Sequence, residues 1–134
     1  AGAADFIQEA WQWKQRLGGS MRQSGIIAAA GLYAFENNVE RLSEDHENAK
    51  YLADRLTGID GIEINPSRVE TNILLLRVDS GKMTAQELAS KLYEQGIRIG
   101  AMNERDVRLV THLDVDRAGV TEAADAIEAL LGEG

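Results

Sequence analysis

The chain has 134 residues, enough for one domain with a sizeable core, and its 44% hydrophobic and 27% charged residues are typical of a globular protein. A net charge of −8 disfavours nucleic acid as a partner. The sequence contains no cysteine, which excludes disulfides and thiolate metal sites and suits a reducing compartment, so we expect a cytoplasmic protein. Its longest small or apolar run, residues 25–35, is too short to span a bilayer, so we expect no membrane segment.

The sequence begins with a pattern that predicts a short helix. Residues 5–8, Asp-Phe-Ile-Gln, have the spacing of a capping box. In this motif the side chain of the first residue accepts from a free N–H group of the first helical turn, and the side chain of the fourth accepts from the N–H of the first. They predict a helix over 6–17, which Gly18 and Gly19 should end in the left-handed conformation. Trp11 and Trp13 lie two residues apart and therefore face different sides, so one indole needs a second surface.

A second and longer helical pattern extends over 20–56. Residues 20–23 repeat the capping-box spacing and predict its start. Because this length is unusual for a globular helix, we expect a bend or break at Asn37-Asn38. Small residues over 25–31 leave a face that another helix or sheet could approach closely. Farther along, an apolar stripe should face the core, while Asp45 and its charged neighbours face water.

After residue 58 the hydrophobic period shortens and indicates strands. The predicted strands cover 62–64, 72–78, 97–100 and 107–111, and the predicted helices cover 85–94, capped by Thr84, and 117–131, capped by Asp116. This order predicts an α+β fold in which a small, mostly antiparallel sheet has helices packed on one side and is preceded by long helices. The pattern lacks the Gly-rich loop of a dinucleotide-binding fold.

Arg108 stands in the middle of an apolar predicted strand. Its guanidinium has five donors that match a carboxylate in bidentate fashion, and a sheet is a costly place for it without an anion. One interpretation is a structural ion pair with one of the 22 acids, and the other is a clamp for a ligand's carboxylate. Alternation places Arg108, Val110 and His112 on one face of the sheet.

The remaining candidates are weaker. Glycines at 18 and 19 lead to a predicted helix N-terminus with Arg22 in its first turn, which would suit a phosphate; the alternative is a helix stop and start with Arg22 paired to a surface acid. His112 and His46 are more often structural residues in such positions, and two distant histidines without cysteine give no support for a transition-metal site. The acidic pairs are typical of a solvated face and a helix cap, so we predict no catalytic residue.

Several ordered motifs together resemble the carboxy-terminal part of low-specificity L-threonine aldolase. The resemblance covers residues 5 to 131 and is carried by 14–31, 40–49, 71–73 and 107–115, the last reading Val-Arg-Leu-Val-Thr-His-Leu-Asp-Val. It implies the fold of the aspartate aminotransferase class of pyridoxal-phosphate enzymes. It also implies a lyase that cleaves L-threonine or L-allo-threonine to glycine and acetaldehyde by a retro-aldol reaction.

The resemblance implies roles for two arginines. The arginine that matches Arg108 holds the carboxylate of the amino-acid substrate in this family. The arginine that matches Arg22 lies near the phosphate of pyridoxal 5'-phosphate and reaches across a subunit boundary, so a homo-oligomer, either a dimer or a tetramer, is expected.

The resemblance also implies how the chain is organised. Residues 1–134 are expected to form a single carboxy-terminal small domain with its leading helices. The large cofactor-binding domain, with the lysine that binds the cofactor covalently, is expected upstream as the missing partner segment, and this chain alone should be inactive. The alternative is a self-standing, non-catalytic α+β module that uses the small-residue face over 25–31 for binding or oligomerisation.

Overall fold

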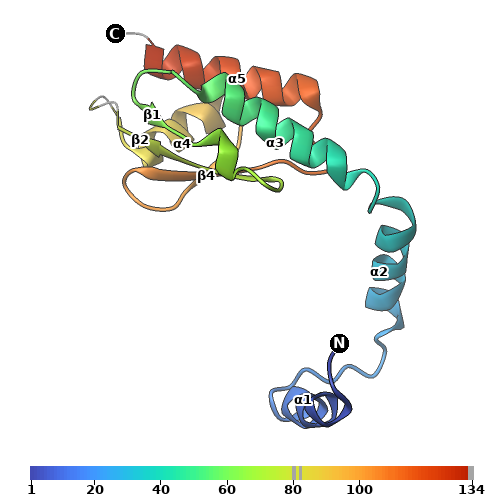
Figure 1. The fold of residues 1–134 in the computed structure, drawn as a ribbon. Coiled ribbons are helices and arrows are strands. Elements are labelled where there is room, and N and C mark those ends of the chain that lie inside the picture. The colour runs from blue at the N-terminus through green and yellow to red at the C-terminus, as the bar shows by residue number, and fades with distance from the viewer. Residues whose placement is uncertain (80, 82, 133–134) are drawn as a thin grey trace. The chain divides into compact units, whose positions relative to one another are not determined.

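A computed structural model describes residues 1–79, 81 and 83–132 of the protein (Figure 1). The chain forms two compact units, Ala1–Val39 and Glu40–Gly134. The first unit consists of two helices and the second contains the sheet with three further helices. We describe each unit by itself.

The first unit contains α1 (Ala4–Arg16) and α2 (Gly25–Asn37). The predicted end of α1 at the glycines is confirmed, because Gly18 has a φ of 77°. Both predicted capping boxes are wrong. Helix α1 begins after Ala3 without a side-chain cap, and α2 begins at Gly25 rather than near residue 20, after Ser24, whose backbone is already helical. The spacing alone is insufficient because a cap needs both a side chain that can accept and an extended backbone at the capping residue; Ala3 lacks the first and Ser24 the second.

Helix α2 is apolar along almost its whole length, yet every one of its residues is exposed or only half-buried. Its largest side chains are among the most exposed apolar groups of the chain, with Ile26 81%, Phe35 78% and Tyr33 64% exposed. The small residues over 25–31, where we expected close packing, are exposed as well. A helix that is hydrophobic all round is normally buried, so α2 has a surface that its own unit does not cover.

The second unit is built on an antiparallel sheet. The described residues form strands β1 (Ile62–Glu63), β2 (Ile73–Val78), β3 (Gly100–Ala101) and β4 (Asp106–Val110), in the order β1-β2-β4-β3. The predicted strand over 97–100 is wrong except for its last residue. Ile97 N–H donates to Leu92 O at 2.9 Å, so this residue belongs to the turn that ends the preceding helix.

A short 3-10 helix, η1 (Pro66–Arg68), was not predicted from the sequence. Asn65 caps it by accepting from Ser67 N–H at 3.1 Å, and the proline stands in its first turn, where a missing N–H costs nothing. The turn connects β1 to β2 and carries Val69, which is buried in the core. Asn65 followed by Pro66 is a pattern that can start a helix, but it is equally common in loops, so three residues were too few to predict η1.

Three helices complete the second unit, α3 (Leu42–Leu56), α4 (Ala85–Glu94) and α5 (Arg117–Gly132). The predicted break near Asn37-Asn38 is confirmed, since α2 ends at Asn37 and α3 begins at Leu42. The helices lie on one side of the sheet (Figure 1), and the predicted α+β architecture is confirmed. The core between them is made of buried aliphatic side chains, including Leu56, Leu74, Leu88, Val107 and Ile127.

The caps of α4 and α5 are as predicted. Glu87 N–H donates to Thr84 Oγ1 at 3.2 Å and Thr84 N–H donates to a Glu87 carboxylate oxygen at 2.7 Å, which is a complete capping box. At α5, Asp116 accepts from Gly119 N–H at 2.9 Å. These hydrogen bonds satisfy N–H groups that the helices themselves leave free.

Glu87→Gln should weaken the pH dependence of stability in acid. The hydrogen bonds from Thr84 hold the pKa of the Glu87 carboxyl below its usual range. A lowered folded-state pKa stabilises the fold above the unfolded-state value, about 4.3, and this contribution is lost as the pH falls through the folded-state value. The free energy of unfolding should therefore fall less steeply below about pH 4.3 in the variant than in the parent chain. Urea unfolding at several pH values measures this.

Glu94→Gln is the matched control, because it removes a carboxylate from the same helix but leaves the cap intact. Equal changes of slope in the two variants would contradict a role for the capping hydrogen bonds.

Candidate functional site

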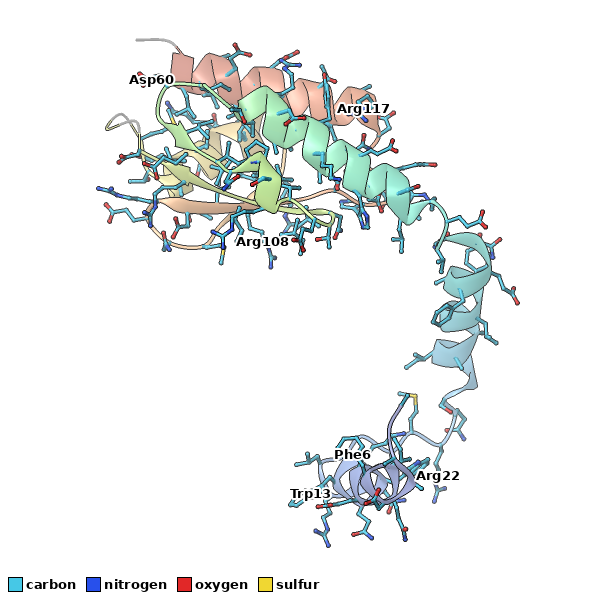
Figure 2. The ribbon with its side chains drawn as sticks, viewed as in Figure 1. Phe6, Trp13, Arg22, Asp60, Arg108 and Arg117 are labelled. Carbon is cyan, nitrogen blue, oxygen red and sulfur yellow. The ribbon has the colours of Figure 1, made fainter. Side chains whose placement is uncertain are left out.

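Arg108 lies on the exposed face of the central strand β4. Its neighbours in the strand, Val107 and Leu109, point into the core and are 0% and 5% exposed, so the alternation predicted from the sequence is confirmed. Directly across from Arg108 lie Leu75 of β2 and Gly100 of β3. Figure 2 shows Arg108 on the side of the sheet that faces away from α3 and α5.

No acidic group among the described residues pairs with Arg108, and its guanidinium makes neither a hydrogen bond nor an ion pair with any described residue. The nearest acid along its strand, Asp106, is already engaged. Arg77 Nε donates to Asp106 at 3.1 Å and Asn103 Nδ2 donates to it at 2.7 Å. Asn103 and then Arg77 hold the pKa of the Asp106 carboxyl below its usual range. The structural ion pair considered for Arg108 is therefore not present in the described part of the chain.

Apolar side chains lie on one side of Arg108 on its face of the sheet, and the Arg77–Asp106 ion pair lies on the other side. Ile73 and Val110 are partners in the antiparallel register and lie on the same face as Arg108 and Leu75, with 43%, 41% and 59% of Ile73, Val110 and Leu75 exposed. Ile73 and Leu75 also line a hollow of about 770 Å³ that extends over β1 and η1. A guanidinium among apolar side chains binds an anion more strongly once the face is covered, because water no longer screens the pair.

His112 follows β4 and is half exposed, with Nδ1 accepting from Asp114 N–H at 3.3 Å. Its ring thus belongs to the turn that leads into α5. It also lines a cavity of about 330 Å³ between the end of β4, the segment 97–99 and the start of α5. The hydrogen bond within its own turn agrees with the structural role that we expected for this histidine.

Arg22 lies in a turn before α2 and is exposed. The expectation that it stands in the first helical turn is wrong, because α2 begins three residues later, at Gly25. No described residue forms a hydrogen bond or an ion pair with it. Arg22 belongs to the first unit and Arg108 to the second, so the two candidate residues are described in separate units.

The described residues offer neither a metal site nor a membrane-spanning helix. They contain no group of three or more His, Cys, Asp or Glu side chains that could hold a metal ion. None of the helices in 1–79, 81 and 83–132 is both long and apolar enough to cross a membrane.

Asp45 is 3% exposed, so the prediction that it faces water is wrong. Its carboxylate accepts from Arg41 at 3.3 and 3.4 Å. A signal was available, since Asp45 lies one helical turn before Asn48 and Ala49 and two turns before Leu52, all of them buried. The default assignment of charged residues to the surface outweighed this spacing.

Comparison with known proteins identifies the family. The family model for beta-eliminating lyases matches residues 1–81, more than half of the chain. The chain belongs to the beta-eliminating lyase family. The segment matched includes Arg22, α2, α3 and the first strands.

Relatives with curated names make the likeness more specific within this family. The chain is 44% identical over 132 residues to the low specificity L-threonine aldolase of Escherichia coli K12, which covers 97% of this chain and 37% of the relative. It is 37% identical over 120 residues to low-specificity L-threonine aldolase 1 of Arabidopsis thaliana, with coverages of 89% and 34%. The resemblance found in the sequence is confirmed. The chain spans little more than a third of the length of these relatives.

Solved structures confirm the fold. A C-DES mutant with glycine covalently linked to its PLP cofactor superimposes with a TM-score of 0.63 at 17% identity, over 78% of this chain and 28% of that chain. The ornithine delta-aminotransferase of Plasmodium falciparum gives a TM-score of 0.53 at 16% identity, over 69% and 25%. The predicted aminotransferase-like fold class is therefore confirmed for this member of the beta-eliminating lyase family.

Proposed function

We propose that the chain is the carboxy-terminal small domain, with its leading helices, of a pyridoxal-phosphate-dependent L-threonine aldolase. In this proposal the complete enzyme cleaves L-threonine or L-allo-threonine to glycine and acetaldehyde, and Arg108 binds the substrate carboxylate. The observation that carries the proposal is the exposed Arg108 on β4, which lacks any anionic partner among the described residues and lies beside the apolar side chains of Leu75 and Val110. Sequence identity to L-threonine aldolases over 97% of the chain supports it.

The role of Arg108 is to orient the substrate. Its planar fork can donate two parallel hydrogen bonds to a carboxylate, which fixes both the position of the amino acid and its rotation. When bound, pyridoxal phosphate supplies an electron sink for a substrate bond that stands perpendicular to its ring. A firm hold on the carboxylate keeps the Cα–Cβ bond at that angle. Such positioning supplies a large part of the barrier reduction in many enzymes without any proton transfer by the positioning residue.

Arg22 fits a role toward the phosphate of the cofactor. Its guanidinium is exposed and unengaged among the described residues, and the donor geometry of arginine suits a phosphate. The turn before it favours glycine, since Gly18 has a φ of 77° and a Cβ at Gly19 would lie 3.1 Å from Lys14 O, closer than an ordinary contact. In the proposed homo-oligomer, a dimer or tetramer, Arg22 reaches the cofactor of a neighbouring subunit. A cytoplasmic location remains our prediction.

The remaining chemistry is assigned to residues outside this chain. In the proposal, the lysine that binds the cofactor and the base that removes the β-hydroxyl proton lie in the larger part of the polypeptide, because the chain spans only 37% of the Escherichia coli relative. The proposal places no catalytic residue among residues 1–134. The 134-residue chain should be inactive alone.

A second candidate function is a non-catalytic oligomerisation module. The apolar surface of α2, exposed within its own unit, favours it. The same surface is expected in the enzyme, where the larger part of the polypeptide or a second subunit would cover it. Catalysis therefore distinguishes the two.

Purified polypeptide of the relatives' length that includes this chain should release glycine and acetaldehyde from L-threonine when pyridoxal phosphate is supplied. It should also show the visible absorbance of protein-bound pyridoxal phosphate. The 134-residue chain by itself is the control and should show neither. A polypeptide that folds and oligomerises, but neither binds the cofactor nor forms glycine, would favour the oligomerisation module.

A further inference from the structure

The buried polar side chains of the described residues meet at one place in the fold. They are Asp45, Asn48 and Thr111, with exposed fractions of 3%, 7% and 2%. The first two lie in the first two turns of α3, and the third follows directly after β4. Asn72, which precedes β2, completes this group, which we call the polar junction.

Hydrogen bonds connect the members of the polar junction across long distances in the sequence. Thr111 Oγ1 donates to the peptide oxygen of Asp45 at 2.7 Å. Asn72 Nδ2 donates to the peptide oxygen of Thr111 at 2.8 Å, and Thr111 N–H donates to that of Asn72 at 3.0 Å. Asn48 Nδ2 reaches the peptide oxygen of Val115 at 3.5 Å. The start of α3 is thus tied to the end of β4 and the start of β2.

Packing alone does not require polar groups at this point. Valine has nearly the shape of threonine, and burying a hydroxyl costs free energy unless its hydrogen bond is made. A fully satisfied polar network does what an apolar contact cannot, because it permits only one arrangement of the elements that it joins. Among the described residues, every buried side-chain nitrogen or oxygen atom has a hydrogen-bond partner.

The polar junction fixes the register of β2 and β4, and this register sets the position of Arg108. The last register pair of the two central strands is Ile73 with Val110, and the junction adds the Asn72–Thr111 pair immediately beyond it. Thr111 lies three residues after Arg108 and points to the opposite face of the sheet. A slip of one residue between the strands would bury Arg108 and expose Thr111. The hydroxyl of Thr111, held by α3, opposes such a slip and small displacements of the same kind.

We propose that the polar junction positions Arg108 for the substrate carboxylate, with Thr111 and Asn72 as positioning residues that act through β4. This proposal rests on the proposed function, in which Arg108 binds that carboxylate. Thr111 and Asn72 do not contact the substrate; they set the place from which the guanidinium reaches it.

The test uses the full-length polypeptide with pyridoxal phosphate and L-threonine. Thr111→Val removes the hydroxyl and keeps the shape, and it should raise KM about fivefold with a smaller change in kcat. Thr111→Ser, which retains the hydroxyl, should restore KM toward the parent value. Asn72→Ala, at the half-buried side of the junction, should raise KM in the same direction and provides a second measurement if Thr111→Val does not fold.

Thr57→Val is the matched control, because Thr57 Oγ1 also donates to a peptide oxygen of α3, that of Ala53, at 2.8 Å. It lies at the other end of the helix and should leave KM unchanged. A double variant then tests whether the effect passes through Arg108. In an Arg108→Lys background, Thr111→Val should add little to KM, since residues that act as a unit are not additive.

Two outcomes would overturn the positioning proposal alone. The first is an unchanged KM in both Thr111→Val and Asn72→Ala. The second is an increase of KM by Thr111→Val that is equally large with Arg108 and in the Arg108→Lys background. Unchanged kinetics in Arg108→Lys itself would instead remove Arg108 from the site, and with it the proposed function.

Discussion

Replacing Arg108 by lysine in the full-length polypeptide should lower kcat/KM for L-threonine by about 100-fold, through both a higher KM and a lower kcat. A lysine keeps the positive charge but offers a point charge in place of a fork, so it attracts the carboxylate without fixing its rotation. The loss of attraction would appear mainly in KM, and the loss of alignment would appear in kcat. Steady-state kinetics of glycine formation over a range of L-threonine concentrations separates the two.

Arg77→Lys is the control for this substitution. Arg77 lies on the same face of the neighbouring strand β2, but its guanidinium already pairs with the Asp106 carboxylate, so it is not free to bind the carboxylate of a ligand. Its replacement should change kcat/KM little. If Arg108→Lys resembled Arg77→Lys in both parameters, the carboxylate would have to be bound elsewhere.

Truncating Leu88 to alanine should destabilise the second unit by about 3 kcal/mol. Leu88 is fully buried on the inner face of α4, between Ala85 and Leu92, so its removal leaves a cavity as well as a loss of apolar contact. The midpoint of urea unfolding of the 134-residue chain, followed by far-ultraviolet circular dichroism, should fall accordingly. The dependence on urea concentration should keep its slope if the variant unfolds in the same manner.

Tyr93→Ala removes a larger side chain from the same helix at a position that is 70% exposed. Its effect on the free energy of unfolding should stay within about 0.5 kcal/mol, as for most surface substitutions. An equal loss in both variants would mean that the inner face of α4 is not packed as described.

Local signals in the sequence were sufficient for much of the second unit. Thr84 with Glu87 and Asp116 identify the starts of α4 and α5 because a cap involves only residues within one turn. The same spacing failed at residues 5–8 because α1 already begins at Ala4, so its capping position is Ala3, which has no side chain that could accept a hydrogen bond. It failed at 20–23 because the backbone of Ser24, directly before α2, is already helical. The strand expected over 97–100 failed because the turn after Gly96 holds Ile97 against α4.

The candidate site could also be predicted only in part. Alternation along one strand was enough to place Arg108 on the face opposite to Val107 and Leu109. The absence of a partner for Arg108 within the described residues could not be read in the sequence, because it depends on Asp106 being engaged by Asn103 and Arg77. The hydrogen bond from Thr111 Oγ1 to the peptide oxygen of Asp45 could not be read in the sequence either, because the two residues are 66 positions apart.

The order of the strands bears on how strongly Arg108 can hold a ligand. Strand β4 lies between β2 and β3, so Arg108 has backbone neighbours on both sides, while the outer strands β1 and β3 have only two residues each. Fraying at the rims of the sheet would leave the central pair intact. If Arg108 binds a ligand as proposed, its position on a central strand means that little backbone freedom would be lost on binding. The conformational entropy of binding is then spent mainly on the ligand and on the arginine side chain itself.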